Sequence, residues 1–277
     1  MKDRLSKTEI GKDALQGSVV AVASTVGEVT SIITKAVKDV ATAIGGLATD
    51  VFEIRDGARK ARTGLADEDT VDVADDTETH DTETDDTQWR CMLGVIGGSG
   101  FYTFFGPDAR TIPLDTPYGE PSAPVTVGTV GEHEVAFLPR HGVKHEYSPH
   151  TVPYRANLWA LRALGVRRIF APCAVGSLTT TLGPGSVVVP DQLVDRTSGR
   201  ADTYFDSNGI HVSFADPYCP TLRAAAAGLP GVVDGGTMVV IQGPRFSTRA
   251  ESKWFAGQGF TLVNMTGYPE AVLAREL

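Results

Sequence analysis

The amino-acid sequence predicts an α/β fold, with a mixed central sheet flanked by helices and preceded by an amphipathic helical segment. Two observations support this prediction. From Met92 onward, short apolar runs alternate with stretches of helical periodicity, which is typical of strands interleaved with helices in one sandwich. Upstream, apolar residues recur at every seventh position, as they do along one face of a helix. The length of 277 residues accommodates one large domain or two small ones.

Residues 1–63 form the first of three segments that differ in composition. Their apolar positions recur every seven residues from Val26 to Ile54, so we expect an amphipathic helix or a pair of helices bent at Gly45-Gly46. Basic residues do not line the polar face. This pattern favours packing or self-association over attachment to a membrane surface.

The second segment, residues 64–90, is strongly acidic. It carries eleven acidic side chains between Asp67 and Asp86, one basic side chain, Arg90, and very few apolar groups. Such a composition does not offset the entropy of ordering, so we expect a disordered linker. The net charge of −9 therefore arises mainly in this linker. The rest of the chain has no basic patch, which predicts that nucleic acid is not a partner.

The third segment, residues 91–277, is expected to form the folded domain. Thr248 followed by Glu251 matches a capping box and predicts that a helix begins there. The predicted strands are 93–97, 124–130, 134–138, 168–174, 185–190, 237–242 and 260–264, and the predicted helices are 154–164, 217–228, 248–257 and 269–277.

The cysteines and the N-terminus indicate a cytoplasmic protein. Cys91, Cys173 and Cys219 have no paired spacing, which is typical of reduced thiols. The N-terminus is charged and lacks the apolar core of a secretory signal. The most apolar window, residues 15–34, contains Glu28 and several hydroxyl side chains, so a membrane span is not expected.

A glycine turn, Gly97-Gly98-Ser99-Gly100, follows the first predicted strand. Its backbone N–H groups and the Ser99 hydroxyl are suited to an anion. The spacing fits neither a Walker loop nor a dinucleotide fingerprint, and many such sequences are plain turns.

About forty residues further on, Arg140 offers a planar fork of donors matched to phosphate oxygens. Arg140 in a surface ion pair and His141 as a structural histidine remain alternatives at this point. His141, His145 and His150 fit no standard spacing of metal ligands, so no metal site is predicted.

Six further motifs follow in order. They resemble the trimeric purine nucleoside phosphorylases, in particular the methylthioadenosine phosphorylase branch, from about Leu93 to Leu277. The motifs are Tyr154 to Leu161, Ala174 to Leu178, Val189 to Thr197, His211 to Tyr218, Gly243 to Ser252 and Asn264 to Glu270.

This resemblance implies phosphorolysis of the N-glycosidic bond of a purine nucleoside. Inorganic phosphate would be the co-substrate, no organic cofactor would be needed, and the assembly would be a homotrimer. Arg140 and His141 would be the catalytic residues, and they would bind phosphate together with Ser99, Thr266 and the backbone at Cys173 and Ala174.

The resemblance also assigns residues to the nucleoside. It places Phe246 against the ribose or purine, Met265 beneath the ribose, and His211 toward the 5′ end, often across a subunit boundary. It places Ser247 where the family tunes substrate choice. Phe246 and Met265 are equally compatible with ordinary core positions.

Two features depart from the family pattern. Cys173 stands where the family usually has threonine or serine, and a thiol is a weaker donor. The chain also stops before the strand that, in the family, carries Asp-x-Asp and neutralises the departing base. We therefore expect a fold that is incomplete at the C-terminus. The alternative function is a truncated, non-catalytic derivative whose N-terminal helix mediates self-association or tethering.

Overall fold

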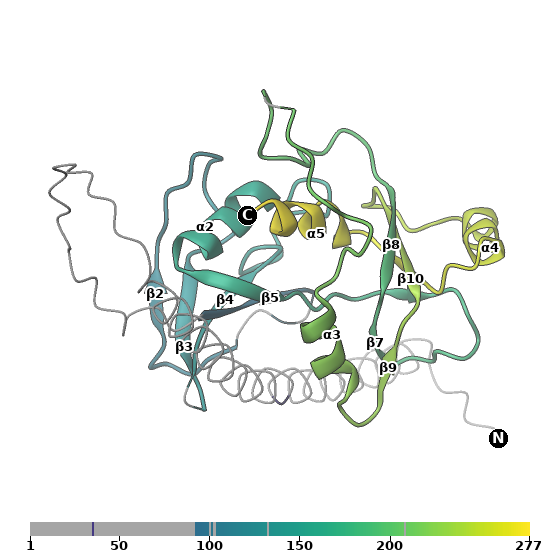
Figure 1. Cartoon of the computed structure of the whole chain (residues 1–277), viewed down its shortest axis with the longest axis horizontal. Helices are drawn as coiled ribbons and strands as arrows, with labels where there is room; N and C mark the ends of the chain where they lie inside the picture. The colour runs from purple at the N-terminus through teal and green to yellow at the C-terminus, as the bar shows by residue number, and fades with distance from the viewer. Residues whose placement is uncertain (1–34, 36–91, 100, 102–103, 132, 208) are drawn as a thin grey trace, which may run out of the picture.

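The computed structural model describes Lys35 and residues 92–277, apart from residues 100, 102–103, 132 and 208 (Figure 1). The expected helical segment 1–63 and the expected acidic linker 64–90 therefore lie outside the described residues, with Lys35 as the one exception. The described part is built from two larger sheets, a two-stranded sheet and four helices.

The first sheet has five strands in the order β2-β3-β4-β1-β5. Strand β1 is central and pairs in parallel with β4 and β5, whereas β2 and β3 pair antiparallel with their neighbours. Five of the six residues of β1 are buried, as expected for a parallel strand covered on both faces. The bounds are β1 Met92–Gly97, β2 Arg110–Ile112, β3 Val125–Val130, β4 His133–Pro139 and β5 Val166–Phe170.

The second sheet has the order β6-β11-β10-β8, with β11, β10 and β8 parallel and β6 antiparallel to β11. A separate parallel pair joins β7 to β9. The bounds are β6 Gly176–Ser177, β7 Val187–Val189, β8 Gln192–Arg196, β9 Val232–Asp234, β10 Thr237–Ile241 and β11 Leu262–Asn264.

Helices α2 and α5 cover one face of the first sheet and pack against each other (Figure 1). Leu158 and Leu161 of α2 and Leu273 of α5 meet Ile96 of β1 and Leu138 of β4 in one buried cluster. Each buried leucine contributes about 1.5–3 kcal/mol relative to an exposed one. The helices are α2 Tyr154–Ala163, α3 Pro220–Ala227, α4 Arg249–Gly257 and α5 Gly267–Glu276.

The other face of β1 packs against aromatic residues. Leu93 and Val95 point toward a cluster that includes Phe101 and Phe137, and Ile96 lies in the helix-side cluster. This alternation fixes the register of β1, because a shift by one residue would exchange its two faces.

The predicted α/β class, with sheets and flanking helices, is confirmed. The capping box at Thr248 and Glu251 is present in full, with both reciprocal hydrogen bonds. The predicted strand 168–174 instead runs from Val166 to Phe170, since the chain leaves the sheet before Pro172.

Other boundaries were also wrong. The helix predicted at 217–228 begins at Pro220, which occupies its first position as proline prefers. The structure adds strands β2, β6, β8 and β9, which were not predicted. Three of these four have at most three residues, too few for any periodicity to be seen.

Candidate active site

Three loops meet at the edge of the first sheet where the parallel strands β4, β1 and β5 end. Gly98 follows β1, Arg140 follows β4, and Pro172 and Cys173 follow β5. A Cβ atom on Gly98 would lie 2.7 Å from Pro172 O, 2.9 Å from Arg140 Nη1 and 3.1 Å from Cys173 Cα. Glycine is therefore required here for the three loops to approach one another.

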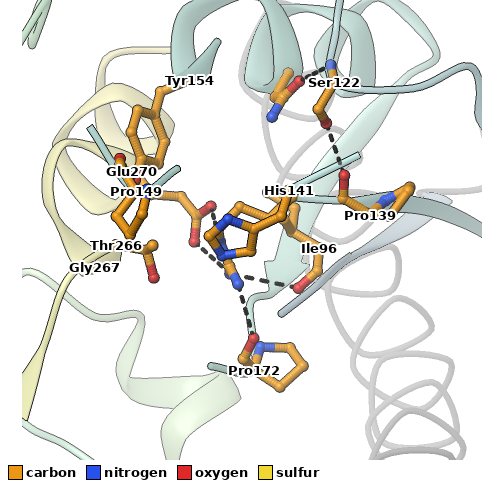
Figure 2. A network of polar contacts seen from close by, with 12 residues as sticks. Ile96, Ser122, Pro139, His141, Pro149, Tyr154, Pro172, Thr266, Gly267 and Glu270 are labelled. Atoms are coloured by element: carbon orange, nitrogen blue, oxygen red, sulfur yellow. Dashed lines mark hydrogen bonds and ion pairs between the residues drawn. The ribbon is translucent and has the colours of Figure 1, made fainter. Parts of the chain in front are cut away.

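Arg140 is fully buried at this junction and is held by a bidentate ion pair (Figure 2). Its Nε and Nη2 atoms donate to the two carboxylate oxygens of Glu270 at 2.7 and 2.8 Å. Nη1 donates to Pro172 O at 3.0 Å, and Nη2 reaches Ile96 O at 3.4 Å. The surface ion pair that the sequence left open is thus wrong, because the pair is in the interior.

The electrostatics of the pair keep Arg140 charged. Burial by itself lowers the pKa of the guanidinium, but the charge and hydrogen bonds of Glu270 outweigh it and raise the pKa overall. Glu270 is buried in the first turn of α5. The pair consequently ties α5 to the end of β4 and fixes the plane of the guanidinium, with Nη1 directed toward Gly98.

His141 is also buried, and its Nδ1 atom lies 2.8 Å from Tyr147 O. Its ring stacks on that of His145 with centroids 4.5 Å apart. Burial lowers the pKa of His141, Arg140 and His145 lower it further, and the hydrogen bond to Tyr147 opposes them. A neutral imidazole that donates Nδ1–H to Tyr147 O follows, and its Nε2 atom is then an acceptor.

Asn264 organises the start of α5. Its Oδ1 atom accepts from the backbone N–H groups of Thr266 at 2.7 Å and Gly267 at 2.6 Å. Its Nδ2 atom donates to Ala174 O at 3.1 Å, which links the loop after β5 to the end of β11. Thr266, at the N-cap of α5, is buried. Tyr268 has non-helical backbone angles (φ −121°, ψ 133°), so the regular part of α5, and the positive end of its dipole, begins after Tyr268.

The remaining residues expected to bind phosphate lie on the same loops. Ser99 is exposed in the turn after β1. Burial raises the pKa of the Cys173 thiol, so the thiol stays protonated. We call Ser99, Arg140, His141, Cys173–Ala174 and Thr266 the phosphate side.

The residues expected to bind the nucleoside are less buried than Arg140 and His141. Met265 is half-buried, and its sulfur would lie 2.8 Å from a Cβ atom on Gly243. Phe246 is 84% exposed on the loop between β10 and α4, so the alternative of a core position is wrong for it. We call Met265, Phe246, Ser247 and His211 the nucleoside side.

Among the described residues, three members of the nucleoside side have no polar contact with the Arg140 junction. The Ser247 hydroxyl pairs with that of Ser252 at 2.8 Å, and His211 is exposed on the segment before α3. Among the described residues, no hydrogen bond or ion pair joins Phe246, Ser247 or His211 to the phosphate side.

A pocket of about 250 Å³ opens at the carboxyl end of β10. It lies beside the loop that carries Phe246 and Ser247, and the Arg196 guanidinium is stacked over the Trp254 ring at 5.5 Å. Its lining residues are Arg196, Ile241, Gln242, Gly243, Arg245, Glu251, Trp254 and Phe255.

Sequence reasoning missed three residues that shape this region. Glu270 was named only as the last residue of a motif, although it is the second residue of the predicted helix 269–277 and an acidic residue in a first helical turn is a signal for an interaction there. Asn264 lies three residues before α5, and the hydrogen bond from Thr266 N, two residues on, to its side chain is an Asx turn. Arg200, whose contacts are described below, carried no local signal.

Within the described residues, no group of three or more His, Cys, Asp and Glu side chains is placed to hold a metal ion. None of the helices in that part of the chain is long and apolar enough to cross a membrane.

Residues 92–277 match the Phosphorylase superfamily, and the chain belongs to this family. An S-methyl-5′-thioadenosine phosphorylase of Mycolicibacterium smegmatis is 89% identical over 186 residues, which are 67% of this chain and 72% of that protein. A purine nucleoside phosphorylase of Streptomyces coelicolor is 55% identical over 202 residues, covering 68% and 72% of the two chains.

A solved structure supports the same assignment. The methylthioadenosine phosphorylase of Schistosoma mansoni in complex with adenine aligns with a TM-score of 0.62 and 37% identity. The alignment covers 67% of this chain and 77% of that chain.

Proposed function

We propose that this chain catalyses phosphorolysis of purine nucleosides, with 5′-methylthioadenosine as the principal substrate. The products are the free purine and (5-methylthio)ribose 1-phosphate. The observation that carries the proposal is the junction of three strand ends at Arg140, in a chain whose relatives are named as phosphorylases of these nucleosides. Inorganic phosphate is the co-substrate, and no organic cofactor takes part.

Phosphate is proposed to bind on the phosphate side. The hydroxyl groups of Ser99 and Thr266 and the backbone N–H groups at Cys173–Ala174 donate to its oxygens. Among the described residues, Arg140 Nη1 donates one hydrogen bond, to Pro172 O, so its second hydrogen serves a phosphate oxygen. Glu270 is a positioning residue that keeps this hydrogen aimed.

His141 is proposed to act as a hydrogen-bond acceptor. A neutral ring whose Nδ1–H is engaged by Tyr147 O presents Nε2 as an acceptor. Monohydrogen phosphate carries one P–OH group, and that group donates to Nε2. The remaining phosphate oxygens, which carry the charge, then face C1′ of the nucleoside.

The reaction that follows is a substitution at C1′. A phosphate oxygen forms a bond to C1′ while the C1′–N9 bond breaks, and the electron pair leaves with the purine. The purine takes up a proton from water to become the free base, and the P–OH proton of the sugar phosphate is released to water in turn. The phosphate charge also stabilises the positive charge that develops on the ribose. Positioning and electrostatics thus supply most of the rate.

The nucleoside is proposed to lie on the nucleoside side, with Met265 beneath the ribose and Phe246 against the ribose or base. Ser247 tunes the choice of substrate. The chain is proposed to act in the cytoplasm as a homotrimer, in which His211 reaches toward the 5′ end of a nucleoside bound to a neighbouring copy. Phe246 and His211 are exposed, which leaves both side chains accessible to a nucleoside or a neighbouring copy.

The test is release of adenine from 5′-methylthioadenosine by the purified chain, with and without inorganic phosphate, followed by chromatography of both products. Adenosine and inosine are compared as substrates. We expect base release only with phosphate, and a stoichiometric sugar 1-phosphate. Release without phosphate would indicate hydrolysis, and no release from any of the three nucleosides would refute the proposal.

A further inference from the structure

Arg200 lies in the segment after β8, and its guanidinium binds carbonyl groups from two different chain segments. Nη1 donates to Met265 O at 2.9 Å and also to Tyr268 O. Nη2 donates to Gln242 O at 2.8 Å and reaches Ile241 O at 3.5 Å. One planar cation therefore joins the end of β10 to Met265, which follows β11, and to Tyr268 at the start of α5.

The guanidinium is itself held in place. Its Nε atom donates to Gln242 Oε1 at 3.3 Å, and the same oxygen accepts from Ser198 N at 3.0 Å. The guanidinium also lies over the ring of Tyr154 at 5.8 Å, and Tyr154 Oη donates to Pro149 O at 2.8 Å. These contacts fix the plane of the guanidinium and its distance from the Tyr154 ring.

Met265 is the residue whose position these contacts of Arg200 affect. Strands β10 and β11 are parallel neighbours, so their carboxyl ends present carbonyl oxygens of like partial charge at one edge. A cation that binds both ends offsets this repulsion and brings Gly243 against the sulfur of Met265. Without it, carbonyl groups on both segments lose a charged donor.

The phosphate side has its own supports. Asn264 holds the N–H groups of Thr266 and Gly267, and Glu270 holds Arg140. None of these bonds involves Arg200. Arg200 binds the carbonyl groups of Met265 and Tyr268, on either side of Thr266 and Gly267. The side-chain bonds to the N–H groups of Thr266 and Gly267, and to the Arg140 guanidinium, come instead from Asn264 and Glu270.

We propose that Arg200 is a positioning residue for the nucleoside: by clamping the ends of β10 and β11, it sets the place of Met265 beneath the ribose. This inference rests on the proposed phosphorolysis. It predicts that loss of the clamp weakens use of the nucleoside far more than use of phosphate.

The test compares R200Q and R200K with the wild type and with R155Q. Arg155 is a matched control, because its guanidinium also binds a backbone carbonyl, Thr203 O, and stacks on Tyr118. Among the described residues it makes no hydrogen bond to β10 or β11. KM for 5′-methylthioadenosine is measured at saturating phosphate, and KM for phosphate at saturating nucleoside.

We expect R200Q to raise the KM for the nucleoside at least about tenfold, with the KM for phosphate changed less than about threefold. R200K should fall between R200Q and the wild type, because an ammonium group cannot match the planar fork. R155Q should resemble the wild type. Equal rises in both KM values, or no rise for the nucleoside, would overturn the inference.

A second measurement covers the case in which R200Q does not fold. The methyl group of Met265 is observed by ¹³C methionine labelling in R200K, with its resonance assigned by M265L. We expect its shift, and the change of that shift on adding 5′-methylthioadenosine, to differ from the wild type. An unchanged Met265 signal together with a wild-type nucleoside KM would overturn the inference.

The wild-type arm separates the two proposals. A wild type without phosphate-dependent base release refutes the proposed function. A wild type that is active, but whose R200Q and R200K variants keep the normal KM for the nucleoside, refutes the role of Arg200 alone.

Discussion

Arg140 and Phe246 are both proposed to serve the substrates, yet Arg140 is fully buried and Phe246 is 84% exposed. Arg140 comes directly from a strand end and is held by Glu270 and two backbone carbonyls. Phe246 lies on a loop with no strand or helix of its own. The surrounding chain therefore covers the Arg140 side chain completely, whereas it leaves the ring of Phe246 largely exposed to solvent.

This difference indicates which part of the proposed site a single chain forms by itself. The phosphate side is formed within one chain, because strand register and a buried ion pair determine it. The aromatic and histidine members of the nucleoside side depend on whatever covers them, which under the proposal is the nucleoside and a second copy. Substitutions on the two sides should consequently differ in their effect on stability and on substrate use.

The largest expected effect is that of E270Q. Removing the carboxylate charge leaves the Arg140 guanidinium buried without a counter-charge, which should lower the free energy of unfolding by about 3–5 kcal/mol. Denaturant unfolding followed by fluorescence measures this change. E134Q is the control, since Glu134 pairs with Arg110 at the same 2.8 Å distance but at the surface. It should change stability by about 1 kcal/mol or less. Equal effects of both variants would show that burial of the pair does not matter.

The next effect concerns binding of phosphate. The double variant R140M/E270Q removes both charges together, so no uncompensated ion stays in the interior. Its affinity for inorganic phosphate, measured by calorimetry, should fall at least about tenfold, which is about 1.4 kcal/mol. Wild-type affinity in the double variant would exclude Arg140 from the phosphate site. R110M serves as a control with an exposed arginine.

A smaller effect is expected in the pH dependence of stability. Burial lowers the pKa of His141 below its ordinary value of 6.5, so below that pH the unfolded chain binds a proton that the folded chain does not. The contribution of the neutral His141 side chain to the free energy of unfolding is complete above pH 6.5. It is lost as the pH falls through the pKa of His141 in the folded chain.

Unfolding free energies between pH 7.5 and 5 measure this contribution in the wild type and H141Q, and the variant should lose less stability on acidification. H150Q, at an exposed position, should follow the wild type. Parallel curves for wild type and H141Q would contradict a neutral, buried His141.

The smallest effect on stability should come from F246A. An exposed ring contributes little to folding, so the free energy of unfolding should change by about 0.5 kcal/mol or less. The KM for 5′-methylthioadenosine should nevertheless rise about tenfold, because stacking on the substrate is lost. A large loss of stability with an unchanged KM would show that Phe246 packs within the fold instead.

Local sequence predicted much of this arrangement. The buried strand β1, the glycine turn after it and the capping box of α4 were recognised because each depends on residues close in the chain. The resemblance to the phosphorylases also grouped Arg140, His141 and Thr266 as phosphate-binding residues, and this grouping stays a prediction. Strands β6 and β9 were missed, because two or three residues do not establish a period.

The sequence by itself determined the apolar periods, the turns and the caps, because backbone geometry couples residues within a few positions of one another. Only the tertiary structure decided that Arg140 is paired with Glu270, 130 residues away, and that Arg200 binds carbonyls at Gln242 and Met265. Nothing in the spacing of these residues indicates their contact. They meet because the parallel order of β4, β1 and β5, and of β8, β10 and β11, brings the strand ends to common edges, where a buried cation must find its anion or its carbonyls.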